Sequence, residues 1–368
     1  MSKVTTIQPR ITKTKVTQKN IMYFGADNLY PNNFLNVINS SPTAKIVTDI
    51  YTKFIFGMGF DLSVYKKKVN QKGLRLDNFF RKLLHDYSRF KGFAVHVSYD
   101  AQFEEVGFTP VPFEKLRLSI PDDNGNVNII QYSDDWSDTR KYPIKNYNIY
   151  TKDKSIIARQ IEIAGGLNKY SGTILYFGEN GEIEYPLAFL DAVKDDMITE
   201  FAVAETKNSN VNTNFLASHI VEVPFSFEKM STIEGDDDGE EYFAQFKTSL
   251  ENLQGGKNAG KFMVLENTMT NPVTGESVEI KLHKVDIQNL DKIHEYTETS
   301  IMNNIRRQSG IPAILIEPVA TGFSTEIMQS AYNYMNNLTY FERLVFEEFF
   351  TELFKDGGNY KIKPLNYI

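Results

Sequence analysis

The stretch that decides the fold runs over residues 186–207 and reads PLAFLDAVKDDMITEFAVAETK. Its apolar residues recur every three or four positions, which predicts one long helix with a buried stripe. At ~1.5 Å per residue, such a helix would be roughly 33 Å long. The stripe consists of Leu187, Leu190, Val193, Met197, Phe201 and Ala204. Because the opposite face is charged, the helix is expected to pack on one side only.

A second charged helix is expected over about residues 287–308, where Ser309-Gly310-Ile311-Pro312 ends it. Between the two helices, residues 208–285 are interpreted as a small module of strands around one helix, residues 242–254. From Ser231 to Gly256, seven acidic residues oppose one Lys, a local net charge of −6. The acidity of the chain, −7 overall, is therefore concentrated in this module.

Upstream of the first charged helix, residues 21–185 predict a mixed α/β region. A helix should begin after Ser41-Pro42, since Ser suits the N-cap and Pro the first turn. Another should run from about Leu76 to Arg89. From Gly92 onward, short strands separated by turn signals indicate a small antiparallel region.

The two ends of the chain differ in character. Residues 1–20 hold five basic residues, no acidic ones and many Thr, which predicts a flexible arm. That arm is either a solvated tail or a contact for an anionic partner. Residues 311–324, IPAILIEPVATGFS, favour an ordered loop, and residues 325–355 predict one long aromatic-rich helix. A closing strand is expected at residues 360–364, which completes a chain of the α+β class.

Composition excludes several classes of site. The chain has no Cys, which rules out disulfides, thiolate metal sites, iron–sulfur clusters and cysteine nucleophiles. No apolar run reaches the ~18 residues of a membrane span. The N-terminus lacks the apolar region of a secretory signal, so none is expected. A net charge of −7 argues against a general nucleic-acid binder.

Three motifs that could carry chemistry are incomplete. Gly255, Gly260 and Lys261 have the spacing of a phosphate-binding loop, but a helix is expected before them and a strand after them, the reverse of the required order. His294-Glu295 begins a zinc motif whose second His is missing. Residues 234–245 lack the bidentate Glu of a calcium loop. We therefore expect no catalytic residue, no metal and no cofactor, and predict that the chain is not an enzyme.

The order of the parts resembles the portal proteins of tailed bacteriophages, also called head–tail connectors. In that family a wing is followed by a stem helix, a clip, a second stem helix, a tunnel loop and a long wing helix. The local segments that carry the resemblance are Asp27-Asn28-Leu29-Tyr30-Pro31, Ser41-Pro42-Thr43, Ile55-Phe56-Gly57-Met58-Gly59-Phe60, Gly255-Gly256-Lys257-Asn258-Ala259-Gly260-Lys261, Val264-Leu265-Glu266, Asp286-Ile287-Gln288 and Ser309-Gly310-Ile311-Pro312-Ala313-Ile314-Leu315.

This resemblance covers about residues 21–360 and implies a portal-like α+β fold. After the arm, the parts would be the α/β wing 21–185, stem helix 186–207, small α/β clip insert 208–285, stem helix 286–309, tunnel loop 310–324, and the long C-terminal wing helix with its closing strand, 325–368. The chain stops soon after that helix, so a helical C-terminal crown is expected to be small or absent.

The resemblance also implies a function. The chain would form a homo-oligomeric ring, of twelve subunits in the family, at one capsid vertex of the virion. Double-stranded DNA would pass through it during packaging and ejection. Its partners would be the large terminase, the major capsid protein, the scaffold and a head–tail adaptor, with assembly in the host cytoplasm and no membrane. Twelve chains at −7 each would carry about −84, which would let DNA slide rather than stick.

Candidate site residues follow from the same resemblance. The second stem helix would steady DNA, or form intersubunit salt bridges, through Lys292, Arg306 and Arg307. The tunnel loop would face DNA, or pack as a plain connector, through Val319, Thr321 and Phe323. The clip would dock a partner, or only aid solubility, through Asp236, Asp237, Asp238, Glu240 and Glu241.

Two other functions stay open. One is a structural or adaptor protein of a virion without a channel, although such a protein has no need of paired long helices around an insert. The other is an enzyme with a nucleotide site at residues 255–261, against which the order of helix and strand argues.

Overall fold

The computed structural model describes residues 15–16, 19–179, 185–213, 219–222, 281–284, 290–316 and 325–367, together with Ala244 and Thr248. These belong to two units. Unit 1 comprises residues 1–198 and 302–368, and unit 2 comprises residues 199–301. The expected helix at 242–254, the acidic segment 234–241 and the loop residues 317–324 lie outside the described residues, apart from Ala244 and Thr248.

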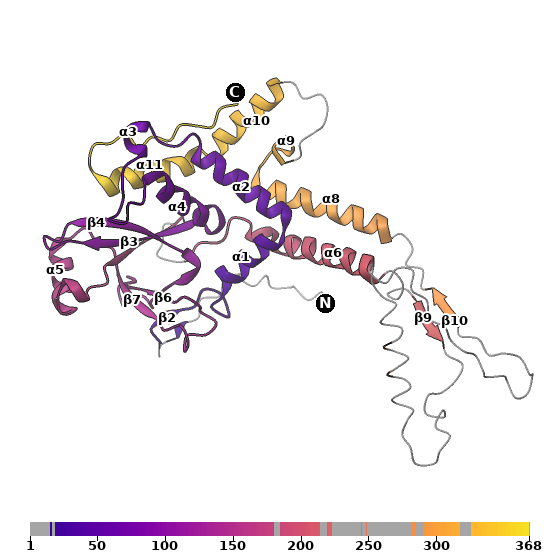
Figure 1. The fold of residues 1–368 in the computed structure, drawn as a ribbon, viewed down its shortest axis with the longest axis horizontal. Coiled ribbons are helices and arrows are strands. Elements are labelled where there is room, and N and C mark those ends of the chain that lie inside the picture. Colours follow the sequence, from indigo (N-terminus) through magenta and orange to yellow (C-terminus); the bar gives the residue numbers. More distant parts are fainter. Residues whose placement is uncertain are drawn as a thin grey trace, which may run out of the picture. The chain divides into compact units, whose positions relative to one another are not determined.

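Unit 1 is built on one eight-stranded sheet with the order β1-β2-β5-β6-β7-β8-β3-β4 (Figure 1). Its strands are β1 Lys15–Val16, β2 Ile21–Met22, β3 Gly92–Tyr99, β4 Glu105–Val111, β5 Leu116–Leu118, β6 Ile129–Tyr132, β7 Lys145–Ile149 and β8 Thr173–Gly178. Neighbouring strands are antiparallel except for β7 and β8, which are parallel.

The parallel pair corrects the prediction of a purely antiparallel region. Parallel neighbours need a long crossover, usually a helix. That crossover is α5, Lys154–Ile163, which the strand pattern of the sequence did not indicate. Its N-cap is Asp153, whose carboxylate accepts a hydrogen bond from the Ser155 amide at 2.8 Å.

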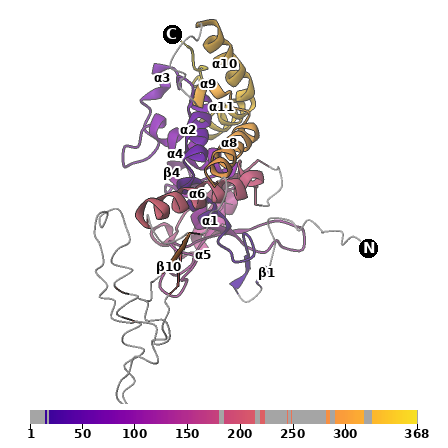
Figure 2. The same cartoon turned by 90° about the vertical axis from the view of Figure 1, so that its right-hand side faces the viewer.

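Unit 1 also contains helices, of which one covers the sheet at β3 and β4. Their bounds are α1 Tyr30–Ser40, α2 Pro42–Phe56, α3 Leu62–Tyr65, α4 Leu76–Phe90, α9 Ala313–Ile316, α10 Thr325–Leu338 and α11 Tyr340–Phe354. Helix α4 packs directly on β3 and β4, and α2 lies against both α4 and α11 (Figures 1 and 2). The predicted starts of α2 and α4 are confirmed, and Ser41 caps α2 by accepting the Ala44 amide at 3.1 Å.

Aromatic rings join this helical layer to the sheet. Phe93 of β3 stacks on Phe346 of α11 with 5.1 Å between ring centroids. Phe80 of α4 lies 5.1 Å from Phe346 and 5.4 Å from Phe350. All four rings are buried. The high aromatic content of the chain is therefore used, at least here, to fill the core.

The first long helix starts later than the sequence predicts. Helix α6 is Lys194–Thr213, preceded by the short 3-10 helix η4, Asp191–Val193. Before it, the Phe189 amide donates to the Arg89 carbonyl at 2.9 Å. Tyr30 donates its hydroxyl proton to the buried Asp191 carboxylate at 2.6 Å. These tertiary contacts keep the residues before η4 out of the helix, overriding the local periodicity.

The last predicted helix is in fact two helices, α10 and α11, divided at Thr339. The Thr339 hydroxyl donates to the Met335 carbonyl at 2.8 Å. The buried Arg343 guanidinium donates to the Thr339 hydroxyl at 2.7 Å, to the Asn336 carbonyl and to the Phe54 carbonyl at 3.1 Å. A side chain in the backbone ladder is a recognised cause of a helix break.

Both ends of the chain differ from expectation as well. Lys15 and Val16 of the supposed arm pair with β2, while residues 1–14 lie outside the described part. At the other end, the expected strand is reduced to one bridge between Gly59 and Lys363. The Lys363 carbonyl lies so close to Gly57 that a Cβ there would clash, and Gly57 also has φ +57°, so only Gly fits.

The core also holds a guanidinium that has no ion-pair partner among the described residues. Arg117 of β5 is fully buried and donates to backbone carbonyls, including that of Leu116, and to the Asn28 amide oxygen at 2.7 Å. Its charge lies 5.0 Å from the Trp136 ring. Burial lowers the pKa of Arg117 to about 10. The group is thus satisfied by hydrogen bonds and a ring face, with no carboxylate in its hydrogen-bonding set.

We predict that Arg117→Lys lowers the free energy of unfolding by about 2–4 kcal/mol, because an ammonium cannot reproduce the planar fork and leaves buried acceptors unpaired. Urea denaturation followed by circular dichroism measures this. The matched control is Arg140→Lys at an exposed position, which should change stability by less than ~0.5 kcal/mol. Equal stability of the two variants would contradict the conclusion that the hydrogen bonds of Arg117 stabilise the core.

Candidate functional site

The two long helices around the insert lie against each other. Helix α8 is Leu290–Ser309. Within unit 2, Lys207 of α6 forms an ion pair with Glu298 of α8. Within unit 1, the Asn304 amide donates to the Asp196 carboxylate at 3.3 Å. The strands β9 His219–Glu222 and β10 Lys281–Lys284 of unit 2 pair antiparallel, which confirms strands expected in the insert.

The basic residues of α8 occupy its last turn. The Arg306 guanidinium is half-buried and donates to the Asn303 side chain at 2.7 Å, whereas Arg307 is exposed. Cations at this position complement the carbonyl end of a helix, so both have a structural reason to be there. Lys292 belongs to α8, but its side chain lies outside the described set. A contact of these residues with DNA stays a prediction.

The other residues proposed from the sequence lie outside the described part. They are Val319, Thr321 and Phe323 of the tunnel loop and Asp236, Asp237, Asp238, Glu240 and Glu241 of the clip. The described start of the loop contains the short helix α9, directly after Pro312. The phosphate-loop spacing at residues 255–261 also lies outside it.

Apolar side chains are exposed on α6. Ile198 is 45% exposed in unit 1 and Phe201 is 41% exposed in unit 2. Leu187, Phe201 and Ala204 were expected in a buried stripe but are exposed, so that part of the prediction is wrong for this chain taken alone. Single exposed apolar side chains are common on protein surfaces, so Ile198 and Phe201 do not by themselves mark an interface.

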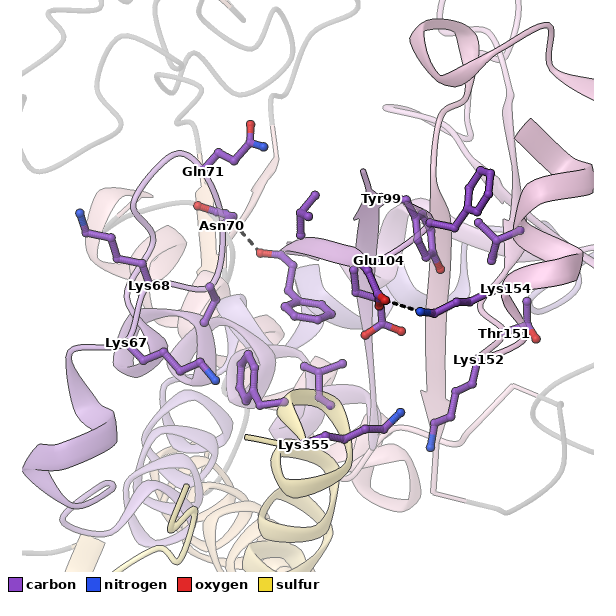
Figure 3. A pocket seen from close by; sticks show the side chains of 18 residues that line it. Lys67, Lys68, Asn70, Gln71, Tyr99, Glu104, Thr151, Lys152, Lys154 and Lys355 are labelled. Carbon is purple, nitrogen blue, oxygen red and sulfur yellow. Dashed lines mark hydrogen bonds and ion pairs between the residues drawn. The ribbon is translucent and has the colours of Figure 1, made fainter. Parts of the chain in front are cut away.

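A cavity of about 590 Å³ opens at the start of β4 (Figure 3). It is bounded by the loop 67–71, the start of β4, the residues leading into α5, and the end of α11. Five lysines and two glutamates line it, a formal balance of +3: Lys67, Lys68, Lys152, Lys154, Lys355, Glu104 and Glu105. No sequence motif predicted this cavity, because its lysines come from three segments that are far apart in the sequence.

One edge of the cavity is fixed by Lys67. Its ammonium lies 2.6 Å from the Asp356 carboxylate, 2.9 Å from the Tyr360 hydroxyl and 3.7 Å from the centroid of the Phe354 ring. The hydrogen bond from Lys67 is the main reason that the pKa of Asp356 falls to about 2. The contact ties the first lysine loop to the end of α11.

Other kinds of site are absent from the described part of the chain. Within it, no group of three or more His, Asp or Glu side chains could hold a metal ion. No helix among the residues described is long and apolar enough to cross a membrane.

Comparison with known proteins rests on structure alone, because no family model and no curated protein matches the sequence. A chain from the neck of a native gene transfer agent particle, computed with C12 symmetry, matches with a TM-score of 0.51 and 13% identity over 91% of this chain and 84% of that chain. The two chains share one fold. The α+β class predicted from the sequence is confirmed.

Two further structures match over most of this chain. A chain from the virion of the native gene transfer agent particle matches with a TM-score of 0.50 and 12% identity, over 90% of this chain and 83% of that one. An HK97-family phage portal protein from Corynebacterium diphtheriae matches with a TM-score of 0.35 and 8% identity, over 79% and 81%. The first of these supports the same fold as the neck chain.

We predict that Asp356→Asn removes a pH-dependent part of the stability. The pKa of this carboxyl is depressed in the folded chain, so its contribution is present above the unfolded value near pH 4 and is lost as pH falls toward about 2. The difference in melting temperature between wild type and variant should therefore shrink between pH 5 and about 2. Asp123→Asn, an exposed carboxylate, is the control and should show no such trend.

Proposed function

We propose that this chain is a portal subunit, which forms a ring at one capsid vertex of a virion and lets double-stranded DNA pass. One observation carries the proposal. The fold is shared over nine-tenths of the chain with a chain from a particle neck treated with twelve-fold symmetry. The order of parts in the sequence supports it independently.

The paired helices suit a ring. Helices α6 and α8 lead out of unit 1 and back into it, on either side of the insert. Ile198 and Phe201 of α6 expose apolar surface that a neighbouring subunit would cover. The acidic balance of the chain favours a channel through which DNA slides, since a binder would instead gain affinity by releasing counterions.

The proposed channel is passive. The chain would hold no catalytic site, and ATP hydrolysis would belong to the large terminase that docks on it. The acidic clip would be the docking surface, first for the terminase and then for a head–tail adaptor. The wing would contact the major capsid protein and the scaffold during assembly in the host cytoplasm.

The second candidate is a structural or adaptor protein of a virion that lacks a channel. It is favoured by two of the structural matches, which are chains from a particle neck. Particle images separate the two, because a portal ring has a central channel wide enough for a duplex and an adaptor without a channel does not.

We expect the purified chain to form rings of about twelve subunits, visible by light scattering and particle imaging. Ile198→Glu with Phe201→Glu should shift it to monomers, because charges on a covered apolar surface oppose association. Both residues are already exposed, so the monomer should keep its melting temperature to within a few degrees. The control is Ile163→Glu on α5, which is 80% exposed and should leave the ring intact. A monomeric wild type at high concentration would contradict the proposal.

We also expect no ATP hydrolysis by the purified chain, measured as phosphate release. Lys261→Ala should behave as wild type in that assay and in ring formation, since the surrounding sequence does not have the order of a phosphate-binding loop. Hydrolysis that Lys261→Ala abolishes would instead establish the nucleotide-binding enzyme.

A further inference from the structure

The cavity at the start of β4 has no part in the proposed channel. All of its lining residues belong to unit 1 and none lies on α6 or α8. Its formal charge is positive, although the chain as a whole is at −7. A local reversal of charge in a defined hollow indicates an anionic ligand.

The lysines of the cavity are only partly neutralised. Lys154 pairs with Glu104, and Lys152 lies 3.0 Å from the Glu352 carboxylate. Lys68 and Lys355 have no ion-pair or hydrogen-bonding partner for their ammonium groups among the residues described. Figure 3 shows the side chains of Lys355 and Lys152 reaching toward each other from opposite walls. Because the Glu352 carboxylate already neutralises Lys152, an added anion would chiefly neutralise Lys355 and Lys68.

Lys152 and Lys154 stand on either side of Asp153, the N-cap of α5, Lys154–Ile163. The Asp153 carboxylate accepts the Ser155 amide and so already meets the partial positive charge of the helix start. The opposite wall ends at Lys355, beyond the last residue of α11. The cavity therefore offers an anion the ammonium groups of its lysines and not a free helix start.

Four of the lining residues give the cavity an apolar part, called its floor: Leu353 and Ile157 are buried, and the Phe103 and Phe354 rings are half-buried. A hollow of about 590 Å³ lies within the range of sites that enclose a ligand. Its occupant should therefore present carboxylates to the lysines and a large apolar side chain to this floor.

Nucleic acid fits the cavity less well than a protein does. The lining has no Arg, and its lysines and glutamates would meet phosphates and carboxylates alike, so charge does not distinguish the two and size decides. A duplex, whose major groove alone is about 12 Å wide, would rest on the rim without reaching the apolar floor. A short peptide can place one side chain on that floor.

We propose that this cavity is a docking site for an acidic segment of a partner protein that carries a large apolar side chain among its carboxylates. The apolar side chain lies over Phe103 and Leu353, and the carboxylates lie between Lys152, Lys355 and Lys68. The site does not require the chain to be a portal, because every residue of it belongs to unit 1.

The test is a fluorescence anisotropy titration of the full chain with a fluorescein-labelled peptide, EEFEELEE. We expect saturable binding that weakens as salt rises, since exposed charges are screened. Lys152→Glu with Lys355→Glu should weaken binding at least ten-fold. The matched control, Lys82→Glu with Lys361→Glu, makes the same charge change at exposed positions outside the cavity and should weaken binding less than two-fold.

Two more probes test the apolar part. Phe103 has φ +62°, so Phe103→Gly removes the ring while relieving an unfavourable backbone angle, and the variant should stay folded. It should weaken binding of EEFEELEE several-fold but leave the weak binding of EEAEEAEE unchanged. The melting temperature of this variant is measured on the same preparation and shows whether the variant is folded.

Several results would overturn the proposal. They are no binding of EEFEELEE at low salt, equal weakening by the two lysine double variants, or tighter binding of a 12-base single-stranded DNA that the cavity variants abolish, which would make this a nucleic-acid site. Ring formation is measured separately by light scattering, so failure here would leave the portal proposal standing, and the reverse holds as well.

Discussion

The stacking of Phe93 on Phe346 joins the first half of unit 1 to its last helix, α11. Phe93 lies on β3, in the first half of unit 1, and Phe346 lies on α11, near its end, with 5.1 Å between the ring centroids. Helix α11 completes a core that β3 and α4 begin. The chain must therefore leave unit 1 and return to it, which makes residues 199–301 an insertion. Helices α6 and α8 are the segments through which the chain leaves unit 1 and re-enters it.

Buried polar groups fix how the returning helices lie on the rest of unit 1. The Lys91 ammonium donates to the Tyr51 hydroxyl at 2.9 Å, and Tyr51 donates to the Glu342 carboxylate at 2.7 Å. Burial, followed by the negative charge of Glu342, raises the pKa of Tyr51 far above its usual value. Arg343 adds bonds to α2 and to the end of α10. Apolar packing supplies the area of contact, and these bonds select one orientation because each unmade bond would leave a buried group unsatisfied.

Periodicity was a good guide wherever a helix packs locally. The apolar spacing located α4, and Ser41-Pro42 located the start of α2, because caps and stripes depend on neighbours in the sequence. It failed at residues 186–193, where Tyr30 and Arg89, both distant in sequence, hold the backbone in another conformation. It failed again at Thr339, since the Arg343 side chain that accompanies the break looks like any exposed helical Arg in the sequence.

The sequence by itself determined the order of the parts, the absence of cysteine chemistry, the concentration of acidic charge in the insert and the resemblance to head–tail connectors. All of these are properties of composition and of local spacing. Only the tertiary structure decided that β7 and β8 are parallel and that the lysines of residues 67–68, 152–154 and 355 surround one cavity. The physical reason is that strand order and cavity walls arise from contacts between distant segments, and one sequence carries no local trace of which segments meet.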